Sequence, residues 1–383
     1  MSFYPRFMLI GGLAQSLVNF REPLLRGLRD AGCEVHAAAA AVHDNDSVVA
    51  RLDSIGVHPH SVPISRAGLN PVSDLRALVA LVRLMHHTRP DLVLGYTIKP
   101  VVWGTLAAWV AGVPRRYAMI TGLGYAFTGK ATRMRARVQR VVKILYRFAL
   151  SRTHGIFFQN PDDLALFREL GLIPDRIPTM VVNGSGVDLD SYPMHPLPEG
   201  PLRFLMIARL LGDKGVREYA AAAAIVRQTH PGAAFHLVGG LDPNPDAISR
   251  EEVENWTARG DIVWHGEQAD VRPYLAEAHV FVLPSYREGT PRTVLEAMAT
   301  GRPIITTDAP GCRETVVDGH NGLLIPARNG DALADAMLRF LSCPEMIDGM
   351  AKRSLDIVRE KYCSEKVTAS MLEAMNIPGK IAR

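Results

Sequence analysis

Two glutamates near an expected helix start form the stretch of this chain best suited to chemistry. Residues 284–307 read PSYREGTPRTVLEAMATGRPIITT, with Glu288 before the helix and Glu296 inside it. Thr290 suits the N-cap and Pro291 the first helical position, so the unpaired N–H groups of the helix would face the preceding loop. Because such a helix end attracts phosphate and other anions, the two carboxylates would bracket an anion site.

A purely structural interpretation of the same residues stays open. Glu296 would pair with Arg292 across one helical turn, and Glu288 would be a solvated acid of the loop. The segment EGTPRTVLEAMATGRPI, however, resembles the signature of the retaining glycosyltransferases of family 4, which have the GT-B fold. The resemblance implies that Glu296 accepts hydrogen bonds from the ribose of a nucleotide sugar and that Glu288 contacts the sugar near its reacting carbon.

A second cluster of polar residues follows an expected strand at residues 203–207. Arg209 and Lys214 lie on the loop after this strand, where two cations can flank a diphosphate from two sides. The alternative is an ordinary pair of surface cations. The family resemblance favours the clamp, which would act with the helix start after Glu288 to stabilise a departing diphosphate. The expected catalytic residues are therefore Glu288, Arg209 and Lys214.

Two further strand ends complete the expected donor site. Gly239 and His265 each follow a strand, and the resemblance places both beside the nucleotide base. A buried structural histidine is the alternative for His265. The residues expected to bind the donor are Gly239, His265, Gly289, Thr290, Pro291, Arg292, Thr293 and Glu296.

The first half of the chain carries the expected acceptor site. Gly11 and Gly12 follow the first strand, but they make only an incomplete dinucleotide fingerprint and are expected to shape the floor of a cleft. The segments GGLAQSLVNFR, YTIKP and TGLGY resemble bacterial family members that extend lipid-linked oligosaccharides, notably those that add N-acetylgalactosamine. This resemblance implies an acceptor site that includes Gly11, Gly12, Lys99, Thr121 and Gly122.

A basic helix is expected within residues 130–152, which contain eight cations and no acid. Met134, Val138, Val141, Leu145 and Phe148 recur at helical spacing and predict an apolar stripe. The stripe would either pack on the core, with solvated arginines around it, or face an anionic neighbour together with them. We expect an anionic membrane surface, or the diphosphate of a lipid-linked acceptor, rather than nucleic acid. The residues assigned to this contact are Arg133, Arg137, Arg140, Lys143 and Arg147.

Composition sets limits on the class of protein. The chain has 383 residues, 48% of them hydrophobic and 21% charged, with a formal charge of +4, as in ordinary globular proteins. The longest apolar run, residues 101–113, is shorter than the roughly 18 residues that span a membrane. The N-terminus lacks a signal-peptide pattern, and the four cysteines lack metal-ligand spacing. We therefore expect a cytoplasmic protein, and the basic helix and the family resemblance imply that it acts at the inner face of the cell membrane.

Strand-like and helix-like segments alternate along the whole chain, which predicts parallel sheets covered by helices. The alternation breaks at residues 184–201, where Gly, Pro and Asp are dense. We expect an α/β protein with two Rossmann-like doubly wound domains that face a cleft, the GT-B arrangement. The expected divisions are an acceptor domain at 1–185, a nucleotide-sugar domain at 186–363, and a C-terminal helix at 364–383 that crosses back to the first domain.

The resulting hypothesis is a retaining transfer of a hexose or N-acetylhexosamine from a UDP-sugar to a polyprenyl-diphosphate-linked saccharide. The sequences Asp44-Asn45-Asp46 and Asp188-Leu189-Asp190 resemble a metal-binding motif, but the first lies in a polar loop and the second in the linker. No metal or other cofactor is therefore expected. Two alternatives remain: a sugar-nucleotide epimerase of the same fold, and a non-catalytic binding subunit. A binding subunit would be expected to lack part of the set Arg209, Lys214, Glu288 and Glu296, and all four are present.

Overall fold

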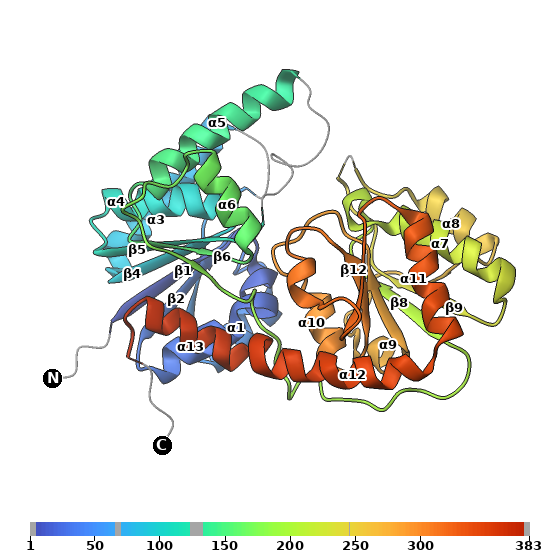
Figure 1. Ribbon diagram of the computed structural model, residues 1–383. Helices are drawn as coiled ribbons and strands as arrows, with labels where there is room; N and C mark the ends of the chain where they lie inside the picture. The colour runs from blue at the N-terminus through green and yellow to red at the C-terminus, as the bar shows by residue number, and fades with distance from the viewer. Residues whose placement is uncertain (1–4, 66–69, 123–132, 245, 379–383) are drawn as a thin grey trace. The chain divides into compact units, whose positions relative to one another are not determined.

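A computed structural model describes residues 5–65, 70–122, 133–244 and 246–378, without the side chains of residues 133–138. The chain divides into two compact units (Figure 1). The first unit contains residues 1–185 and 364–383, and the second contains residues 186–363. Each unit is built on one parallel sheet.

The first unit has a seven-stranded sheet in the order β3-β2-β1-β4-β5-β6-β7, with all neighbours parallel. Its strands are β1 (Arg6–Ile10), β2 (Glu34–Ala39), β3 (Val57–Ser61), β4 (Leu92–Tyr96), β5 (Arg115–Ile120), β6 (Gly155–Phe158) and β7 (Thr179–Val181). Its helices are α1 (Ala14–Asp30), α2 (Asp46–Ser54), α3 (Pro71–Thr88), the π-helical turn η1 (Pro100–Gly104), α4 (Thr105–Val110), α5 (Arg133–Leu150), α6 (Pro161–Glu169) and α13 (Ser364–Ala374).

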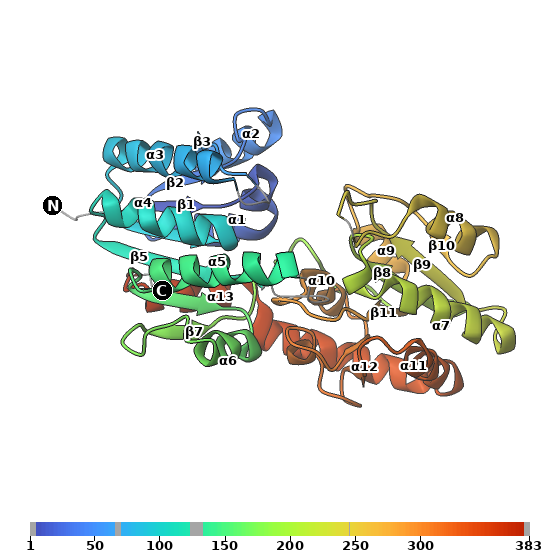
Figure 2. The same ribbon diagram turned by 90° about the horizontal axis from the view of Figure 1, so that it is seen from above.

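Alternate residues of β1 pack on the two opposite faces of the sheet of the first unit. Phe7 and Leu9 pack with α1 and α13, whereas Met8 and Ile10 pack with α3 and α4 on the opposite face. This alternation follows from the two-residue period of a strand, and burial on both faces explains why the strand is continuously apolar. Figure 2 shows α3, α4 and α5 following one another along one face.

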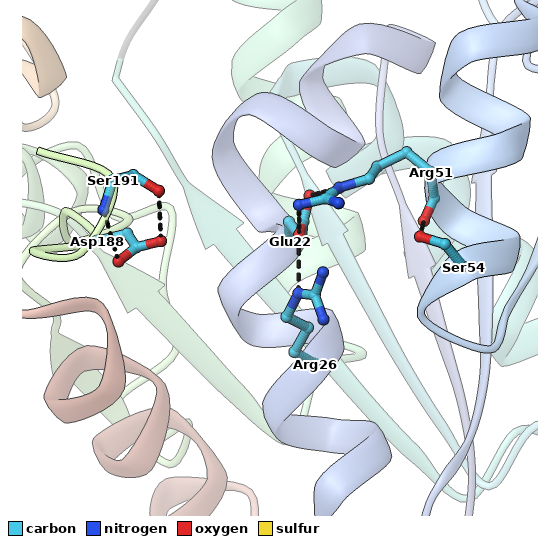
Figure 3. Close-up of polar contacts among 6 residues, drawn as sticks. All are labelled: Glu22, Arg26, Arg51, Ser54, Asp188 and Ser191. Atoms are coloured by element: carbon cyan, nitrogen blue, oxygen red, sulfur yellow. Dashed lines mark hydrogen bonds and ion pairs between the residues drawn. The ribbon is translucent and has the colours of Figure 1, made fainter. Parts of the chain in front are cut away.

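Contacts between helices complete the first unit. Thr368 and Leu372 of α13 lie against Gly27 of α1, where a side chain would clash with Thr368. On the other side of α1, Glu22 receives hydrogen bonds from both Arg26 and Arg51, and Arg51 belongs to α2 (Figure 3). Both α2 and α13 are therefore held on α1.

The second unit repeats the same plan with six parallel strands in the order β10-β9-β8-β11-β12-β13. The strands are β8 (Arg203–Ile207), β9 (Ala234–Val238), β10 (Val263–Trp264), β11 (Val280–Leu283), β12 (Ile304–Thr307) and β13 (Gly322–Ile325). The helices are η2 (Gly212–Lys214), α7 (Val216–Thr229), α8 (Arg250–Ala258), α9 (Arg272–Glu277), α10 (Arg292–Ala299), η3 (Arg313–Thr315), α11 (Gly330–Ser342), α12 (Glu345–Ile357) and η4 (Val358–Tyr362). Figures 1 and 2 both show α7 beside α11.

Strand order fixes where each unit can bind a ligand. The order reverses between β1 and β4 in the first unit and between β8 and β11 in the second. In doubly wound sheets the crevice beyond the carboxyl ends of such strands is the usual ligand site. The residues that follow these four strands are therefore the first places to look for chemistry.

The segment after Ser185 is fixed by polar contacts within the second unit. Asp188 accepts hydrogen bonds from the backbone of Asp190 and from the backbone and hydroxyl of Ser191, which closes a tight turn (Figure 3). Asn45, in the other aspartate-rich sequence, caps α2 by accepting from the Val48 amide. Both sequences thus have structural roles in these turns.

Candidate active site

An ion pair joins two of the expected catalytic residues. Lys214 Nζ donates to Glu288 Oε1 at 2.5 Å, and each side chain is 16% exposed. Lys214 ends the turn after β8, and Glu288 lies in the loop after β11, so the two residues follow the strands that flank the reversal of strand order. The interpretation of Glu288 as a solvated loop acid is therefore wrong.

Backbone contacts lock these two loops together. Asp213 O accepts hydrogen bonds from the Tyr286 amide at 2.8 Å and from Ser285 Oγ at 3.2 Å. Gly215 has a φ of +74°, and a Cβ on it would lie 2.2 Å from Pro284 O. The close approach of the loops consequently requires glycine at this position.

The loop after β12 also contacts the backbone of Glu288, and this contact was not predicted from the sequence. The Glu288 amide donates to Pro310 O at 2.9 Å. Gly311 has a φ of +81°, and a Cβ there would lie 2.2 Å from Glu288 O. The signal was available, because Pro310-Gly311 follows a buried strand and marks a tight turn. Gly311 therefore allows the loop after β12 to pack directly on the Glu288 backbone.

Glu296 lies in a buried polar cluster. Its carboxylate accepts from Arg292 Nε at 2.8 Å and from the Tyr192 hydroxyl. Burial raises the pKa of Glu296, and the Arg292 charge and the two hydrogen bonds oppose that rise. The pairing with Arg292 that a structural interpretation suggested is thus present. Tyr192 is a further contact that spacing along the chain did not reveal.

The helix after Glu288 starts one residue later than expected. Pro291 is the N-cap and makes no side-chain cap hydrogen bond, and Arg292 is the first residue of α10. The prediction of Thr290 as N-cap is wrong, because Pro291 has an extended ψ of 106° that keeps it outside the helix. Gly289 is buried, and Thr290 and Thr293 are partly buried at this end.

Arg209 points to a carboxylate that the sequence interpretation did not consider. Its Nη1 donates to Asp242 Oδ2 at 3.0 Å, and its side chain is 55% exposed while that of Asp242 is 11% exposed. Arg209 also acts electrostatically on Asp213, the neighbour of Lys214. The two expected clamp cations therefore border the same turn but have different carboxylate partners.

Gly239 and His265 lie together at the ends of β9 and β10. A Cβ on Gly239 would lie 1.9 Å from Ala208 O, and the Gly239 carbonyl accepts from Trp264 Nε1 at 2.9 Å. His265 Nε2 is 2.9 Å from His236 Nδ1 in a stacked pair, and burial lowers the pKa of His265. His265 is partly buried, so it combines a structural contact with accessible surface.

The first unit gathers its expected residues at the ends of β1, β4 and β5. The Tyr96 side chain occupies the space that a side chain at residue 11 would need. A Cβ on Gly11 would lie 2.3 Å from the Tyr96 hydroxyl oxygen. Thr121 and Gly122 are partly buried, and residues 123–132, which follow them, lie outside the described residues. The Lys99 ammonium donates to Asp74 at 2.8 Å and to Ser65 at 2.5 Å, with its side chain 11% exposed.

The basic helix is present as α5, but its buried face differs from the expected stripe. Val142, Tyr146, Ala149 and Leu150 face the core. Val141 and Phe148 of the stripe are 45% and 44% exposed, whereas Leu145 is partly buried against the core, so the described part of the stripe packs on the core only at Leu145. The reason is that apolar residues occur on two faces of α5. The backbone of Arg133 and Arg137 lies in α5, but their side chains are outside the description.

An exposed apolar cluster accompanies the cations on this face. Ile144 is 62% exposed, and Trp109 and Val110 of α4 are 44% and 57% exposed. Trp109 meets Phe148 edge to face at 6.1 Å. The cations nearby are Arg140, Lys143 and Arg147, and among the described residues none of them forms an ion pair with a carboxylate. In the part of the chain that is described, no helix is long and apolar enough to cross a bilayer.

Comparison with known proteins identifies the family of this chain. The model of the "Glycosyl transferase 4-like domain" family matches residues 19–184, and that of "Glycosyl transferases group 1" matches residues 201–343. A Campylobacter jejuni N,N'-diacetylbacillosaminyl-diphospho-undecaprenol alpha-1,3-N-acetylgalactosaminyltransferase is 30% identical over 91% of this chain and 93% of its own. This chain belongs to the family 4 glycosyltransferases.

Other relatives of this glycosyltransferase support the assignment. An Escherichia coli UDP-Gal:alpha-D-GlcNAc-diphosphoundecaprenol alpha-1,3-galactosyltransferase is 28% identical over 73% of each chain. Sucrose-phosphate synthase from Thermosynechococcus elongatus has a similar fold, with a TM-score of 0.78, 18% identity and coverage of 97% and 98%. Anabaena HepE, solved with UDP and glucose, gives a TM-score of 0.75 at 16% identity, with coverage of 97% and 100%. The fold is GT-B, and the enzyme class is glycosyltransferase.

Proposed function

We propose that this glycosyltransferase moves a hexose or N-acetylhexosamine from a UDP-sugar to a polyprenyl-diphosphate-linked saccharide, with retention at the anomeric carbon. The product would enter surface glycan or glycoprotein biosynthesis. The Lys214–Glu288 pair is the observation that carries this proposal, because it places a cation and an acid at the usual ligand position of a doubly wound sheet. The activities of the Campylobacter and Escherichia coli relatives support the choice of a lipid-diphosphate acceptor.

In the proposed reaction, the bond between the sugar carbon and the diphosphate breaks as an acceptor hydroxyl attacks. Lys214 and Arg209 stabilise the charge that grows on the departing diphosphate, together with the N–H groups of Gly289, Thr290, Arg292 and Thr293. The leaving phosphate oxygen takes the proton of the attacking hydroxyl, on the same face of the sugar. Glu296 binds the ribose, and Gly239 and His265 border the base.

Glu288 has a positioning role in this proposal. Its carboxylate already accepts from Lys214, so it orients that cation and contacts the sugar beside the reacting carbon. Retaining glycosidases present two carboxylates that flank the bond to be cleaved, whereas a front-face displacement needs no protein nucleophile. Purified Glu288→Gln enzyme should keep a measurable residual rate. Complete loss of transfer, with a glycosyl-enzyme isolated from wild type, would rule out the front-face route.

The proposed reaction requires no bound metal, since protein cations and helix N–H groups supply the positive charge. We expect transfer rates to be unchanged after dialysis against EDTA, measured as UDP released on addition of a lipid-linked acceptor. Acceptor-dependent UDP release also distinguishes a transferase from an epimerase of the same fold. An EDTA-sensitive rate that Mg²⁺ or Mn²⁺ restores would contradict the metal-free reaction.

We place the acceptor in the first unit, beside Gly11, Gly12, Thr121 and Gly122. These residues follow β1 and β5, next to the reversal of strand order. Lys99 would act at this site by holding the segment after β4, because its ammonium is already bound to Asp74 and Ser65. This role for Lys99 differs from the direct contact expected from the sequence.

We further propose that α5 and α4 rest on the anionic inner surface of the cell membrane. Exposed Val141, Ile144, Phe148 and Trp109 would enter the interface, while Arg140, Lys143 and Arg147 attract anionic headgroups. Arg133 and Arg137 belong to the same helix and would add to the attraction. This placement would bring a lipid-linked acceptor to the first unit, in a cytoplasmic enzyme with peripheral attachment.

Vesicle sedimentation tests the membrane proposal. Wild type should bind vesicles that contain phosphatidylglycerol and should dissociate as salt rises, because headgroup attraction is screened. Gln at Arg140, Lys143 and Arg147 together should weaken binding at least tenfold, and Ile144→Ser should weaken it without changing the salt dependence. A matched control carries Gln at Arg250, Lys352 and Arg359, three exposed cations of the second unit. Equal binding by the α5 variant and the control would contradict the proposal.

A further inference from the structure

Thr97 has a backbone conformation that its side chain disfavours. It follows β4 directly and has a φ of +67°. Among the described residues with positive φ other than glycine, it is the only one with a β-branched side chain. Such a residue is a genuine outlier, and backbone strain of this kind persists where the surrounding structure enforces it, often at a functional site.

The surroundings of Thr97 explain how this conformation is held. The Val101 amide donates to Thr97 O at 3.0 Å, which starts the helical turn that continues into η1. Two residues on, Lys99 is fixed to Asp74 of α3 by a buried ion pair. One residue before, Tyr96 is buried and its hydroxyl is 2.7 Å from Ser16 Oγ of α1. Thr97 is therefore clamped from both sides while remaining exposed itself.

The hydroxyl of Thr97 lies at the reversal of strand order. Thr97 follows β4, Gly12 comes shortly after β1, and a Cβ on Gly12 would lie 3.3 Å from Thr97 Oγ1. Among the described residues the Thr97 hydroxyl has no hydrogen-bond partner. An exposed, unpaired hydroxyl beside a glycine, at the usual ligand position of the sheet, is suited to bind a ligand oxygen.

We propose that Thr97 binds a hydroxyl of the acceptor saccharide and helps to determine which acceptor is used. This inference rests on the proposed function, because it assigns a contact within the acceptor site of that reaction. In the observed backbone conformation the hydroxyl lies close to Gly12. Neither spacing nor residue type distinguished Thr97 in the sequence.

Three substitutions separate the hydroxyl from the strain. Thr97→Val keeps the shape and the strain but removes the hydroxyl, so the KM for the lipid-linked acceptor should rise about tenfold, as for loss of one hydrogen bond. Thr97→Ser keeps the hydroxyl and should stay within about twofold of wild type. Asparagine tolerates positive φ, so the thermal midpoint of the Thr97→Asn variant should rise. The acceptor KM of this variant should also rise. The KM for the UDP-sugar should stay unchanged in all three.

Thr257→Val is the control, since it removes the hydroxyl of another exposed threonine, on α8 of the second unit, where that hydroxyl donates to Val253 O. It should leave both KM values unchanged. An unchanged acceptor KM in Thr97→Val, or an effect on the donor KM alone, would overturn the inference while leaving the proposed function intact. Absence of acceptor-dependent UDP release by the wild type would instead overturn the proposed function, and this inference with it.

Discussion

Lys214 and Glu288 illustrate what residue types alone reveal about this site. Each follows an apolar strand, and parallel strands end at one edge of a sheet, so the sequence placed both residues in one site. It did not predict that they pair with each other, nor that Arg209 pairs with Asp242. Which carboxylate each cation pairs with depends on the conformations of turns that are far apart in the chain. The spacing of residues does not predict these conformations.

Lys214 should contribute to catalysis through its position in the site and not through its charge alone. Lys214→Met removes a cation from the proposed leaving-group site, and kcat should fall by about 10²–10³-fold, as for loss of one preorganised charge or donor. Single-turnover assays with saturating UDP-sugar measure this step. Lys352→Met removes a lysine with a carboxylate partner at 2.6 Å on the exposed face of α12 and should leave kcat unchanged. Similar rates for the two variants would contradict the assignment.

Gly311 provides a test of the loop behind Glu288. Gly311→Ala adds a Cβ that would lie 2.2 Å from Glu288 O, so the loop must move and kcat should fall at least tenfold. Gly319→Ala is the control, because its φ is +70° but no atom lies within 4 Å. Both variants should lose about 1 kcal/mol of stability through unfavourable φ. Loss of activity in Gly311→Ala alone would confirm that displacement of the Glu288 backbone is the cause.

At the scale of elements, the alternation of segments predicted parallel sheets in both halves of the chain, and the strand expected at residues 203–207 is β8. Buried parallel strands are short apolar runs between turn residues, which makes them easy to recognise. The orientation of α5 was harder, because Val141 and Phe148 on one face and Val142 and Ala149 on another both suit a core. Packing against neighbouring helices determines which face of such a helix is buried. The local periodicity of apolar residues does not predict this packing.

A histidine cluster on β2 and β3 should make the first unit sensitive to acid. His36 Nδ1 lies 3.0 Å from His60 Nε2, and the tilted rings of His58 and His36 have centroids 5.1 Å apart. Burial lowers the pKa of His60 from 6.5 to about 4, and the charges of its neighbouring histidines add to the effect. The folded state therefore resists protonation while the unfolded state accepts it, so stability should fall as pH drops from about 6.5 towards 4.

Thermal unfolding followed by circular dichroism at pH 7 and pH 5 measures this effect. His60→Gln should reduce the loss of thermal midpoint between the two pH values, because one group with a lowered pKa is removed. His86→Gln, which replaces an exposed histidine of α3, should not reduce it. An equal pH dependence in wild type and His60→Gln would show that other groups control acid sensitivity.

At the scale of the whole molecule, the sequence indicated two α/β sheets through alternation and a break near residue 185. The donor sugar, the linkage and the acceptor glycan depend on a few side-chain contacts in loops, and composition and periodicity do not encode them. The same holds for Thr97, whose importance lies in its backbone conformation. The order of elements along the chain nevertheless affects the stability of the first unit, because α13, which follows the second unit in sequence, belongs to the first.

A chain that ends at Cys363 should therefore lose the first unit and keep the second. Met371, Leu372, Met375 and Ile377 are buried in the core around α1, and burial of four such side chains contributes on the order of 6–12 kcal/mol as an upper estimate. Since whole domains are stable by only about 5–15 kcal/mol, the first unit should unfold. Hydrogen exchange should then show rapid exchange in β1–β6 and continued protection in β8, β9, β11 and β12. A chain ending at Pro378 retains these contacts and should protect both sheets, and protection of β1 in the shorter chain would contradict the prediction.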